Sequence, residues 1–405
     1  MSRFDPLTTL NSAAGIESSV NLSDESVFAH ARAVTECPDV VRLNNDLPDI
    51  RKARTMIRPS LRWGSSLKPN ATLLIEMPGP VGFRYDLVCT DARGVAKNRV
   101  GPPQRLENAK TIAMLGGSTV MGTGSRLPEW TIPAQVERLL RDGGTPVNCM
   151  NFGVAGMTSR DSLAQLIDAV IPQKPDLVVL YSGWNCAFNY QLNAWLRASE
   201  GYADHGIHEG MGSRQMELGR LLAGSYGVRS NLARGLWLAS NQLTSWLKSS
   251  LPIRSVGSVV DRLRQLDPTV NGRAIGELVT GLPGCQKALS DEAAETYLRV
   301  MRLAASVCSS EGIGFVGIFQ PNLFWGAKVR TAEESQFVAN EPVDPDSQIG
   351  FYQALKQCGL SDHVCDLSQT FAHESRQTYI DTGHLNPLGN QLMAEAISQY
   401  LQDLL

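Results

Sequence analysis

The sequence lacks an excess of charge of either sign. Its 405 residues include 37 Lys and Arg against 40 Asp and Glu, which gives a formal net charge of −3. Proteins that bind nucleic acid through its phosphates usually carry a basic patch or stripe, so we predict no nucleic-acid partner. The charged fraction is only 19% and the hydrophobic fraction is 43%. This composition is typical of a folded globular protein and excludes a disordered chain.

Long apolar runs are also missing. No window approaches the roughly eighteen uninterrupted apolar residues that a membrane-spanning helix needs. Residues 1–15 contain no basic segment followed by an apolar one, so a secretion signal is not expected. We therefore predict no integral membrane span and a cytoplasmic location.

Signals for metals, disulfides and nucleotides are weak. The eight cysteines are scattered without a CxxC pair, which favours reduced, mostly buried thiols. His205 and His208 lack the neighbouring ligands of a metal site. The glycine-rich segment after residue 115 has no Lys-Ser/Thr ending, and Gly122-Thr-Gly124 lacks the third glycine of a dinucleotide loop. The sequence predicts no metal and no cofactor.

From residue 111 onward, short apolar runs alternate with segments of helical periodicity. Thr158 with Asp161 forms a capping-box pattern, Ser290 precedes a long amphipathic segment, and Asn386-Pro387 is typical of a helix start. Strands are expected at 111–115, 146–151, 176–181, 314–319 and 364–367. This alternation predicts an α/β fold, a doubly wound parallel sheet covered by helices on both faces.

Two regions depart from this alternation. Residues 1–105 are predicted to be an N-terminal extension, in which 57–103 forms a small β-rich segment because short apolar runs alternate with Pro and Gly. Residues 106–405 are predicted to be the main domain. Within it, residues 188–289 are rich in Leu, Trp and Arg and are predicted to be a helical insertion. That insertion is either a subdomain packed on the core or a lid or acceptor-binding surface over the site.

Small polar motifs follow the first three expected strands. Ser118 lies in Gly-Gly-Ser-Thr, Gly156 lies in Asn-Phe-Gly-Val-Ala-Gly-Met-Thr, and Asn185 lies in Ser-Gly-Trp-Asn. The carboxyl ends of parallel strands share one edge of the sheet, which is where ligands of open α/β sheets bind. We therefore expect these three residues to converge.

A fourth motif, Asp381-Thr-Gly-His384, directly precedes the last helix. An Asp at this spacing can accept a hydrogen bond from the imidazole Nδ1–H, which leaves Nε2 to take a serine proton. Taken alone, His384 could equally have a structural capping role. The serine motif favours the catalytic interpretation.

These four motifs, in this order, resemble the signature blocks of the SGNH (GDSL-type) hydrolase family, over residues 111–401 without the insertion. The resemblance implies a flavodoxin-like three-layer sandwich. It also implies that Ser118 is the nucleophile, His384 the general base and then acid, and Asp381 the residue that orients the histidine. The oxyanion hole would use the backbone N–H groups of Ser118 and Gly156 and the side-chain amide of Asn185.

The sequence departs from the family pattern at two positions. Gly117 and Cys186 stand where the family has Asp, and we expect both to remove local hydrogen bonds without affecting the proton relay. Met157 and Trp184 lie beside the expected donors and are predicted to be apolar substrate-binding residues. The segment 319–321, with Lys328 and Glu333, is similar to family members from bacterial glycan and secondary-metabolite gene clusters.

The predicted function is a serine hydrolase of the esterase, deacylase or thioesterase type. Its partner would be a small-molecule or glycan acyl ester, cleaved through an acyl-serine intermediate. An acyltransferase would use the same intermediate with a hydroxyl or amine acceptor, and a third hypothesis is a catalytically silent binding module. The residues do not define the acyl group, the leaving group or the oligomeric state.

Overall fold

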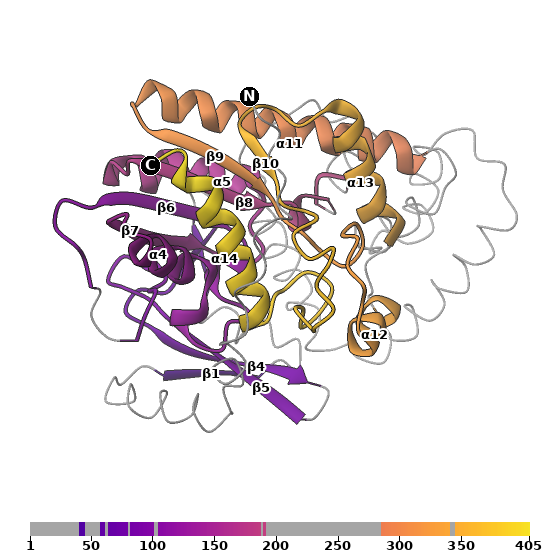
Figure 1. Ribbon diagram of the computed structural model, residues 1–405, viewed down its shortest axis with the longest axis horizontal. Coiled ribbons are helices and arrows are strands. Elements are labelled where there is room, and N and C mark those ends of the chain that lie inside the picture. Colours follow the sequence, from indigo (N-terminus) through magenta and orange to yellow (C-terminus); the bar gives the residue numbers. More distant parts are fainter. Residues whose placement is uncertain are drawn as a thin grey trace, which may run out of the picture.

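The computed structural model describes residues 40–44, 57–60, 64–79, 82–100, 104–187, 189–191, 285–340 and 345–405. Its centre is a five-stranded sheet in the order β10-β9-β8-β6-β7, in which all neighbouring strands are parallel (Figure 1). Each strand overlaps a segment predicted to be one, so the predicted α/β fold is confirmed. The strands are β6 (Lys110–Gly116), β7 (Val147–Gly153), β8 (Leu177–Ser182), β9 (Gly314–Phe319) and β10 (Val364–Asp366).

The sheet is apolar on both faces. Successive side chains of a strand point to opposite faces, so a run of consecutive apolar residues makes both faces apolar. In β6, Ile112 and Met114 join one core cluster, whereas Ala113 and Leu115 join the other, and all four are fully buried. Helices cover both clusters, which produces the expected three layers (Figure 1). The first face packs against α4 (Ile132–Asp142) and α14 (Pro387–Gln402), and the second against α5 (Ser159–Gln165), α11 (Cys285–Ser310) and α13 (Pro345–Cys358).

Helix starts follow the sequence signals closely. Thr158 caps α5, and both hydrogen bonds of its capping box with Asp161 are present. The Asn386 side chain accepts from the N–H of Gly389 at the start of α14. Three features differ from the predictions: α11 begins before Ser290, and neither α12 (Ala332–Asn340) nor α13 was expected. Since α13 buries polar side chains among its apolar ones, its helical periodicity is weak.

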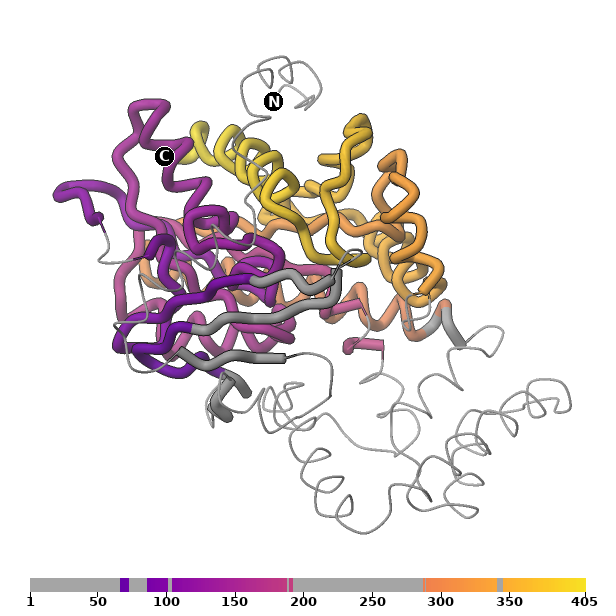
Figure 2. Tube along the Cα trace, turned by 90° about the horizontal axis from the view of Figure 1, so that it is seen from below, coloured from indigo at the N-terminus to yellow at the C-terminus, as the bar shows by residue number. Residues whose placement is uncertain are grey.

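The N-terminal region is rich in β structure, as predicted (Figure 1). Its described end, drawn in indigo in Figure 2, lies against the main domain. The strands of this region are β1 (Val40–Asn44), β4 (Thr72–Gly79) and β5 (Gly82–Cys89) in one sheet, and β2 (Ile57–Ser60) and β3 (Gly64–Leu67) in a second. Backbone hydrogen bonds join this region to the main domain: Leu87 N–H donates to the Arg126 carbonyl at 3.0 Å, and Ala96 N–H to the Asn151 carbonyl at 3.1 Å. The boundary predicted at residues 105 and 106 stays a prediction.

Most of the predicted insertion, residues 192–284, lies outside the described residues. Its two described ends, 189–191 and 285–289, are helical. Among the helices that the structure describes, none combines the length and the hydropathy needed to cross a membrane.

Candidate active site

Ser118 lies directly beyond the carboxyl end of β6. At that end Gly116 pairs with Tyr181 of β8, and an added Cβ at Gly116 would lie 2.4 Å from the Tyr181 carbonyl oxygen. The chain turns at Gly117, and Ser118 begins the short helix α3 (Ser118–Met121). The strand order reverses between β6 and β8. The serine hydroxyl therefore lies at the switch point of the sheet, the usual ligand position in this architecture.

Ser118, His384 and Asp381 form a continuous chain of hydrogen bonds. Ser118 Oγ lies 2.6 Å from His384 Nε2, and His384 Nδ1 lies 2.6 Å from Asp381 Oδ2. The other carboxylate oxygen, Oδ1, accepts from the backbone N–H groups of Gly383 at 2.8 Å and His384 at 2.7 Å. The turn is closed by the Ile380 N–H, which donates to the His384 carbonyl at 3.0 Å. The structure thus brings together the three residues that the sequence predicted as a triad.

The electrostatics of Asp381 fix the direction of these hydrogen bonds. Burial alone would raise the pKa of Asp381, but the neighbouring His384 charge and the hydrogen bonds from its ring and from two backbone N–H groups together hold that pKa below its ordinary value. The carboxyl group is therefore ionised at neutral pH and can only accept. It accordingly accepts a hydrogen bond from the Nδ1–H of His384. The lone pair on Nε2 is then left to accept a hydrogen bond from the Ser118 hydroxyl.

Asn185 lies between the serine turn and the loop after β7. Its Nδ2 donates to the Met157 carbonyl at 3.0 Å. The same nitrogen lies directly over Gly117, where an added Cβ would approach it to 2.7 Å. An amide nitrogen carries two hydrogens, so the bond to Met157 leaves one for a ligand. Because Gly117 has no side chain, the Asn185 amide can lie directly against the serine turn.

Gly156 lies in the loop after β7, which the Val154 N–H ties to the Gly116 carbonyl at 3.0 Å. Its φ of 79° is in the left-handed region that favours glycine. Among the described residues, no acceptor is assigned to the N–H of Gly156 or to that of Ser118. The arrangement can offer two backbone donors beside the Asn185 amide. A triad and three such donors suit acyl transfer through a tetrahedral intermediate.

Trp184 lies against the turn that carries the histidine. An added Cβ at Gly383 would lie 2.8 Å from the Trp184 ring, and the indole stacks on Phe324 with a centroid distance of 5.8 Å and an interplanar angle of 4°. Beside it, the Leu323 N–H donates to the Thr382 carbonyl at 3.0 Å. Trp184 therefore packs the end of β8 against the Asp381–His384 turn. Its predicted contact with substrate stays a prediction.

Met157 differs from the expectation of a pocket wall. Its side chain is 3% exposed and packs in a third apolar cluster, with Leu67 and Val88 from the N-terminal region and Met121 after the serine. Its backbone carbonyl, and not its side chain, contacts Asn185. Apolar character at this position serves the packing of the N-terminal region onto the main domain.

Cys186 also corrects an expectation, because it does not remove local hydrogen bonding. Its Sγ accepts from the Ser159 N–H at 3.3 Å at the start of α5. The Ser159 hydroxyl in turn lies 2.5 Å from the Tyr190 hydroxyl, which accepts from the Arg160 N–H at 2.9 Å. Burial raises the pKa of the Cys186 thiol. The residue is a buried, neutral thiol that closes a small polar network.

Two buried carboxylates near the site were not predicted. One of them, Glu334, forms an ion pair with Lys328 at 3.2 Å. The sequence contains a signal for Glu334, since Thr331 and Glu334 form a capping-box pattern at the start of α12.

The second carboxylate, Asp86 of β5, is fully buried and accepts from the N–H groups of residues 124 and 126, at 2.9 and 3.0 Å. Asp86 carried no local signal, because its partners are distant in sequence.

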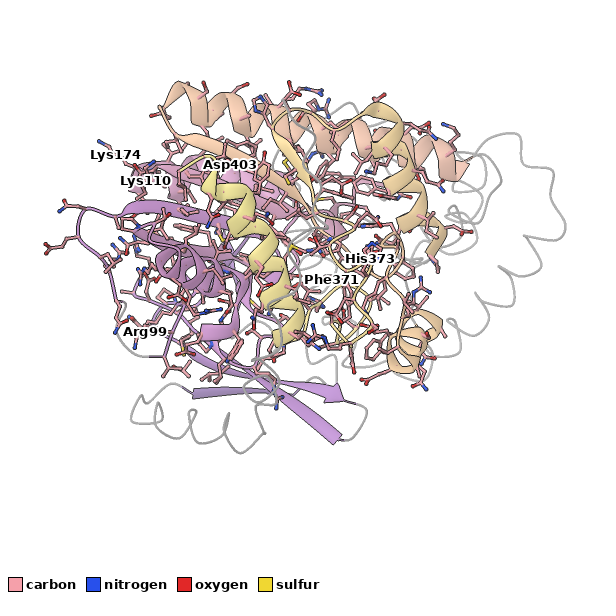
Figure 3. The ribbon with its side chains drawn as sticks, in the orientation of Figure 1. Arg99, Lys110, Lys174, Phe371, His373 and Asp403 are labelled. Atoms are coloured by element: carbon pink, nitrogen blue, oxygen red, sulfur yellow. The ribbon has the colours of Figure 1, made fainter. Side chains whose placement is uncertain are left out.

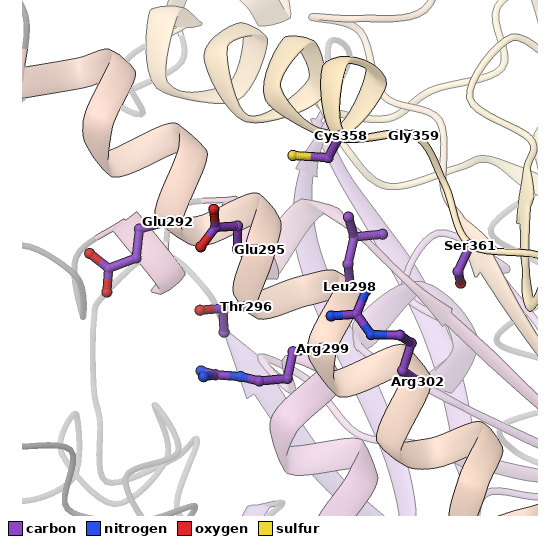
Figure 4. Close-up of a pocket in the computed structure, with 9 residues that line it drawn as sticks. All are labelled: Glu292, Glu295, Thr296, Leu298, Arg299, Arg302, Cys358, Gly359 and Ser361. Carbon is purple, nitrogen blue, oxygen red and sulfur yellow. The ribbon is translucent and has the colours of Figure 1, made fainter.

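A separate cavity of about 600 Å³ lies between α11 and the loop after α13 (Figure 4). Charged side chains of both signs line it, among them Glu295 and Arg299, together with the exposed thiol of Cys358. None of the predicted site residues lines this cavity. Among the described residues, no group of three or more His, Cys, Asp or Glu side chains could hold a metal ion.

No family model and no curated protein matches the sequence. Solved structures do show a likeness. An acetyl xylan esterase, AlAXEase, is 13% identical with a TM-score of 0.35, over 72% of this chain and 99% of that one. A lipase/acylhydrolase from Enterococcus faecalis is 14% identical with a TM-score of 0.36, over 73% and 96%. A lipolytic protein of the G-D-S-L family from Desulfitobacterium hafniense DCB-2 is 10% identical with a TM-score of 0.32, over 72% and 98%. These values are too low to assign a family.

Proposed function

We propose that this protein is a serine hydrolase of the SGNH type that cleaves an acyl ester through an acyl-serine intermediate. Ser118 Oγ attacks the acyl carbonyl carbon while its proton passes to His384 Nε2. The histidine then gives this proton to the leaving alkoxide, which departs as an alcohol. In the second half, His384 takes a proton from water as the water oxygen attacks the acyl carbon. The bond between that carbon and Ser118 Oγ then breaks, the acid leaves, and His384 returns the proton to Ser118 Oγ.

The observation that carries this proposal is the unbroken chain from Ser118 Oγ to His384 Nε2 and from His384 Nδ1 to Asp381, with both distances at 2.6 Å. A serine that only caps a helix needs no imidazole, and a histidine that only caps a turn needs no serine. The ionised Asp381 would stabilise the imidazolium that forms when the serine proton is transferred.

The tetrahedral intermediate places negative charge on the former carbonyl oxygen. We assign its stabilisation to the N–H groups of Ser118 and Gly156 and to the side-chain amide of Asn185. In comparable sites, the loss of one such donor costs about 3–4 kcal/mol of transition-state stabilisation. The positive φ of Gly156 supports this assignment, because the left-handed conformation sets the direction of its N–H and excludes most side chains.

The substrate class is an acyl ester carried by a small molecule or a glycan, with a thioester as a related possibility. Trp184, beside the Asn185 donor, offers an apolar surface for an acyl group. An acyltransferase would share every step up to the acyl-serine and would then use a hydroxyl or amine in place of water. A silent binding module would need none of the proton relay.

The test is hydrolysis of p-nitrophenyl esters of increasing acyl length by the full chain. We expect p-nitrophenol release by the wild type and by Ser309→Ala, a control on the exposed side of α11, and none above background by Ser118→Ala. Analysis of the acyl product with and without added alcohols or amines separates hydrolysis from transfer. Equal release of p-nitrophenol by the wild type and by Ser118→Ala would refute both the hydrolase and the acyltransferase hypothesis.

A further inference from the structure

A buried ion pair lies behind the histidine turn and has no part in the proton relay. Lys328 Nζ and Glu334 Oε2 are 3.2 Å apart, and the two side chains are only 2% and 0% exposed. Lys328 lies in the segment after β9, and Glu334 lies in the first turn of α12. Removing two charges from water is costly, so such a pair persists only where further hydrogen bonds complete it.

Four hydrogen bonds of this pair go to the backbone of one segment of the chain. The Lys328 ammonium donates to the backbone carbonyls of Glu374 and Arg376, both at 2.8 Å. Glu334 Oε1 accepts from the backbone N–H groups of Thr378 at 2.9 Å and Tyr379 at 3.2 Å. The pair thus binds residues 374–379 through both the backbone carbonyl groups and the backbone N–H groups of that segment.

Residues 374–379 lead directly into the triad turn. Tyr379 pairs with Leu385 in an antiparallel bridge, and the Asn386 N–H donates to the Thr378 carbonyl at 2.9 Å. The segment is thus one arm of a short hairpin, and Asp381 and His384 lie in its turn. On the same arm, the Tyr379 ring packs edge-on against Phe371, with centroids 5.5 Å apart.

We propose that the Lys328–Glu334 pair positions the Asp381–His384 turn so that Nε2 meets the Ser118 hydroxyl. The proposal rests on the proposed function and makes both residues positioning residues, since neither contacts the reacting atoms. The hairpin lies outside the regular strands and helices, so the sheet does not set its place. Displacements of about 1 Å at a reacting group can reduce turnover roughly 100-fold.

Glu334→Gln is the informative variant. The glutamine carbonyl can still accept from the N–H groups of Thr378 and Tyr379, but its NH₂ would then face the Lys328 ammonium and the Thr331 N–H, which are both donors. We expect kcat to fall at least tenfold with KM nearly unchanged. Glu333→Gln is the matched control, because it changes the same residue type one position earlier, and it should behave as wild type.

A second readout does not depend on turnover. A histidine Nδ1–H shared with a carboxylate gives a low-field proton NMR signal, which should be present in the wild type and in Glu333→Gln. It should be absent from Asp381→Asn and lost or shifted in Glu334→Gln. If the wild type shows the signal and Glu334→Gln alters it, the positioning role stands even where no ester is hydrolysed, and only the proposed function fails.

A double variant, Lys328→Met with Glu334→Gln, covers the case in which Glu334→Gln does not fold, since it leaves no unpaired buried charge. We expect it to fold and to show the same altered signal and lowered kcat. A wild-type signal and wild-type kcat in either variant overturn the proposal, as does absence of the signal from the wild type. If both variants fail to fold while Glu333→Gln folds, the pair serves stability alone and the proposal is also wrong.

Discussion

The serine side and the histidine side of the site are built in different ways. Ser118 follows β6, which pairs with β7 along its whole length and with β8 from Ile112 to Gly116, so backbone register fixes its position. His384 lies in a hairpin turn outside the regular elements. Side chains contact that turn from three sides. Asp381 bonds to it from within, Trp184 packs on it from the segment after β8, and Glu334 with Lys328 holds the chain that leads into it.

This difference predicts where substitutions act. A sheet edge is set by many backbone hydrogen bonds, and no single side chain controls it. A turn set by a few side chains is sensitive to each of them. Substitutions on the histidine side should therefore lower turnover while leaving the fold intact.

The largest effect should come from Asp381→Asn. The amide oxygen can still accept from the Gly383 and His384 N–H groups, but its NH₂ would donate to His384 Nδ1 and so place the ring proton on Nε2. That tautomer cannot accept the Ser118 proton, and we expect kcat to fall about 10⁴-fold. Ester hydrolysis assays measure this loss. Asp403→Asn at the exposed end of α14 (Figure 3) is the control, and a near-normal kcat in Asp381→Asn would remove that residue from the relay.

Asn185→Ala should have the next largest effect. It would remove the amide donor that we propose for the oxyanion hole, and comparable losses reduce kcat about 10²- to 10³-fold. Asn185→Asp, which keeps the shape but has no N–H to donate, should be impaired to a similar degree. Steady-state kinetics with a short-chain ester test both variants. Full activity in Asn185→Asp would show that the amide N–H does not stabilise the transition state.

Gly383→Ala should have a moderate effect, because it disturbs the histidine turn and leaves the serine side unchanged. The new Cβ would lie 2.8 Å from the Trp184 ring, so the turn or the indole must shift. We expect kcat to fall about 10- to 100-fold, the range for small misplacements of a catalytic group. Adding Trp184→Leu should restore part of the loss. An unchanged kcat in the single variant would mean that this contact does not position the turn.

The smallest effect should be on stability as a function of pH. The pKa of Asp381 is held below its ordinary value of about 4, so its charge stabilises the fold above that pH. This contribution is lost as the pH falls through the lowered pKa in the folded state. Urea unfolding of wild type and Asp381→Asn should therefore differ more at pH 6 than at pH 3. A difference that grows at pH 3 would contradict the sign of the shift.

The same comparison explains what the sequence could predict. The central strands follow from apolar runs, and the placement of Ser118, Gly156 and Asn185 follows from strand ends in a parallel sheet. The packing of Met157 under the N-terminal region and the contacts of Lys328 and Glu334 with residues 374–379 depend on segments that are distant in sequence. Periodicity reports which side of an element is buried, and does not report which distant residue lies against it.

The most direct test of the account is the position of a covalent adduct. The intact protein is treated with a fluorophosphonate, and the modified peptide is identified by mass spectrometry. We predict one adduct per chain, on Ser118, with no adduct in Ser118→Ala and much slower labelling in His384→Ala. A wild type that is not labelled, or an adduct on another serine while Ser118 stays unmodified, would contradict the assignment of Ser118 as the nucleophile activated by His384.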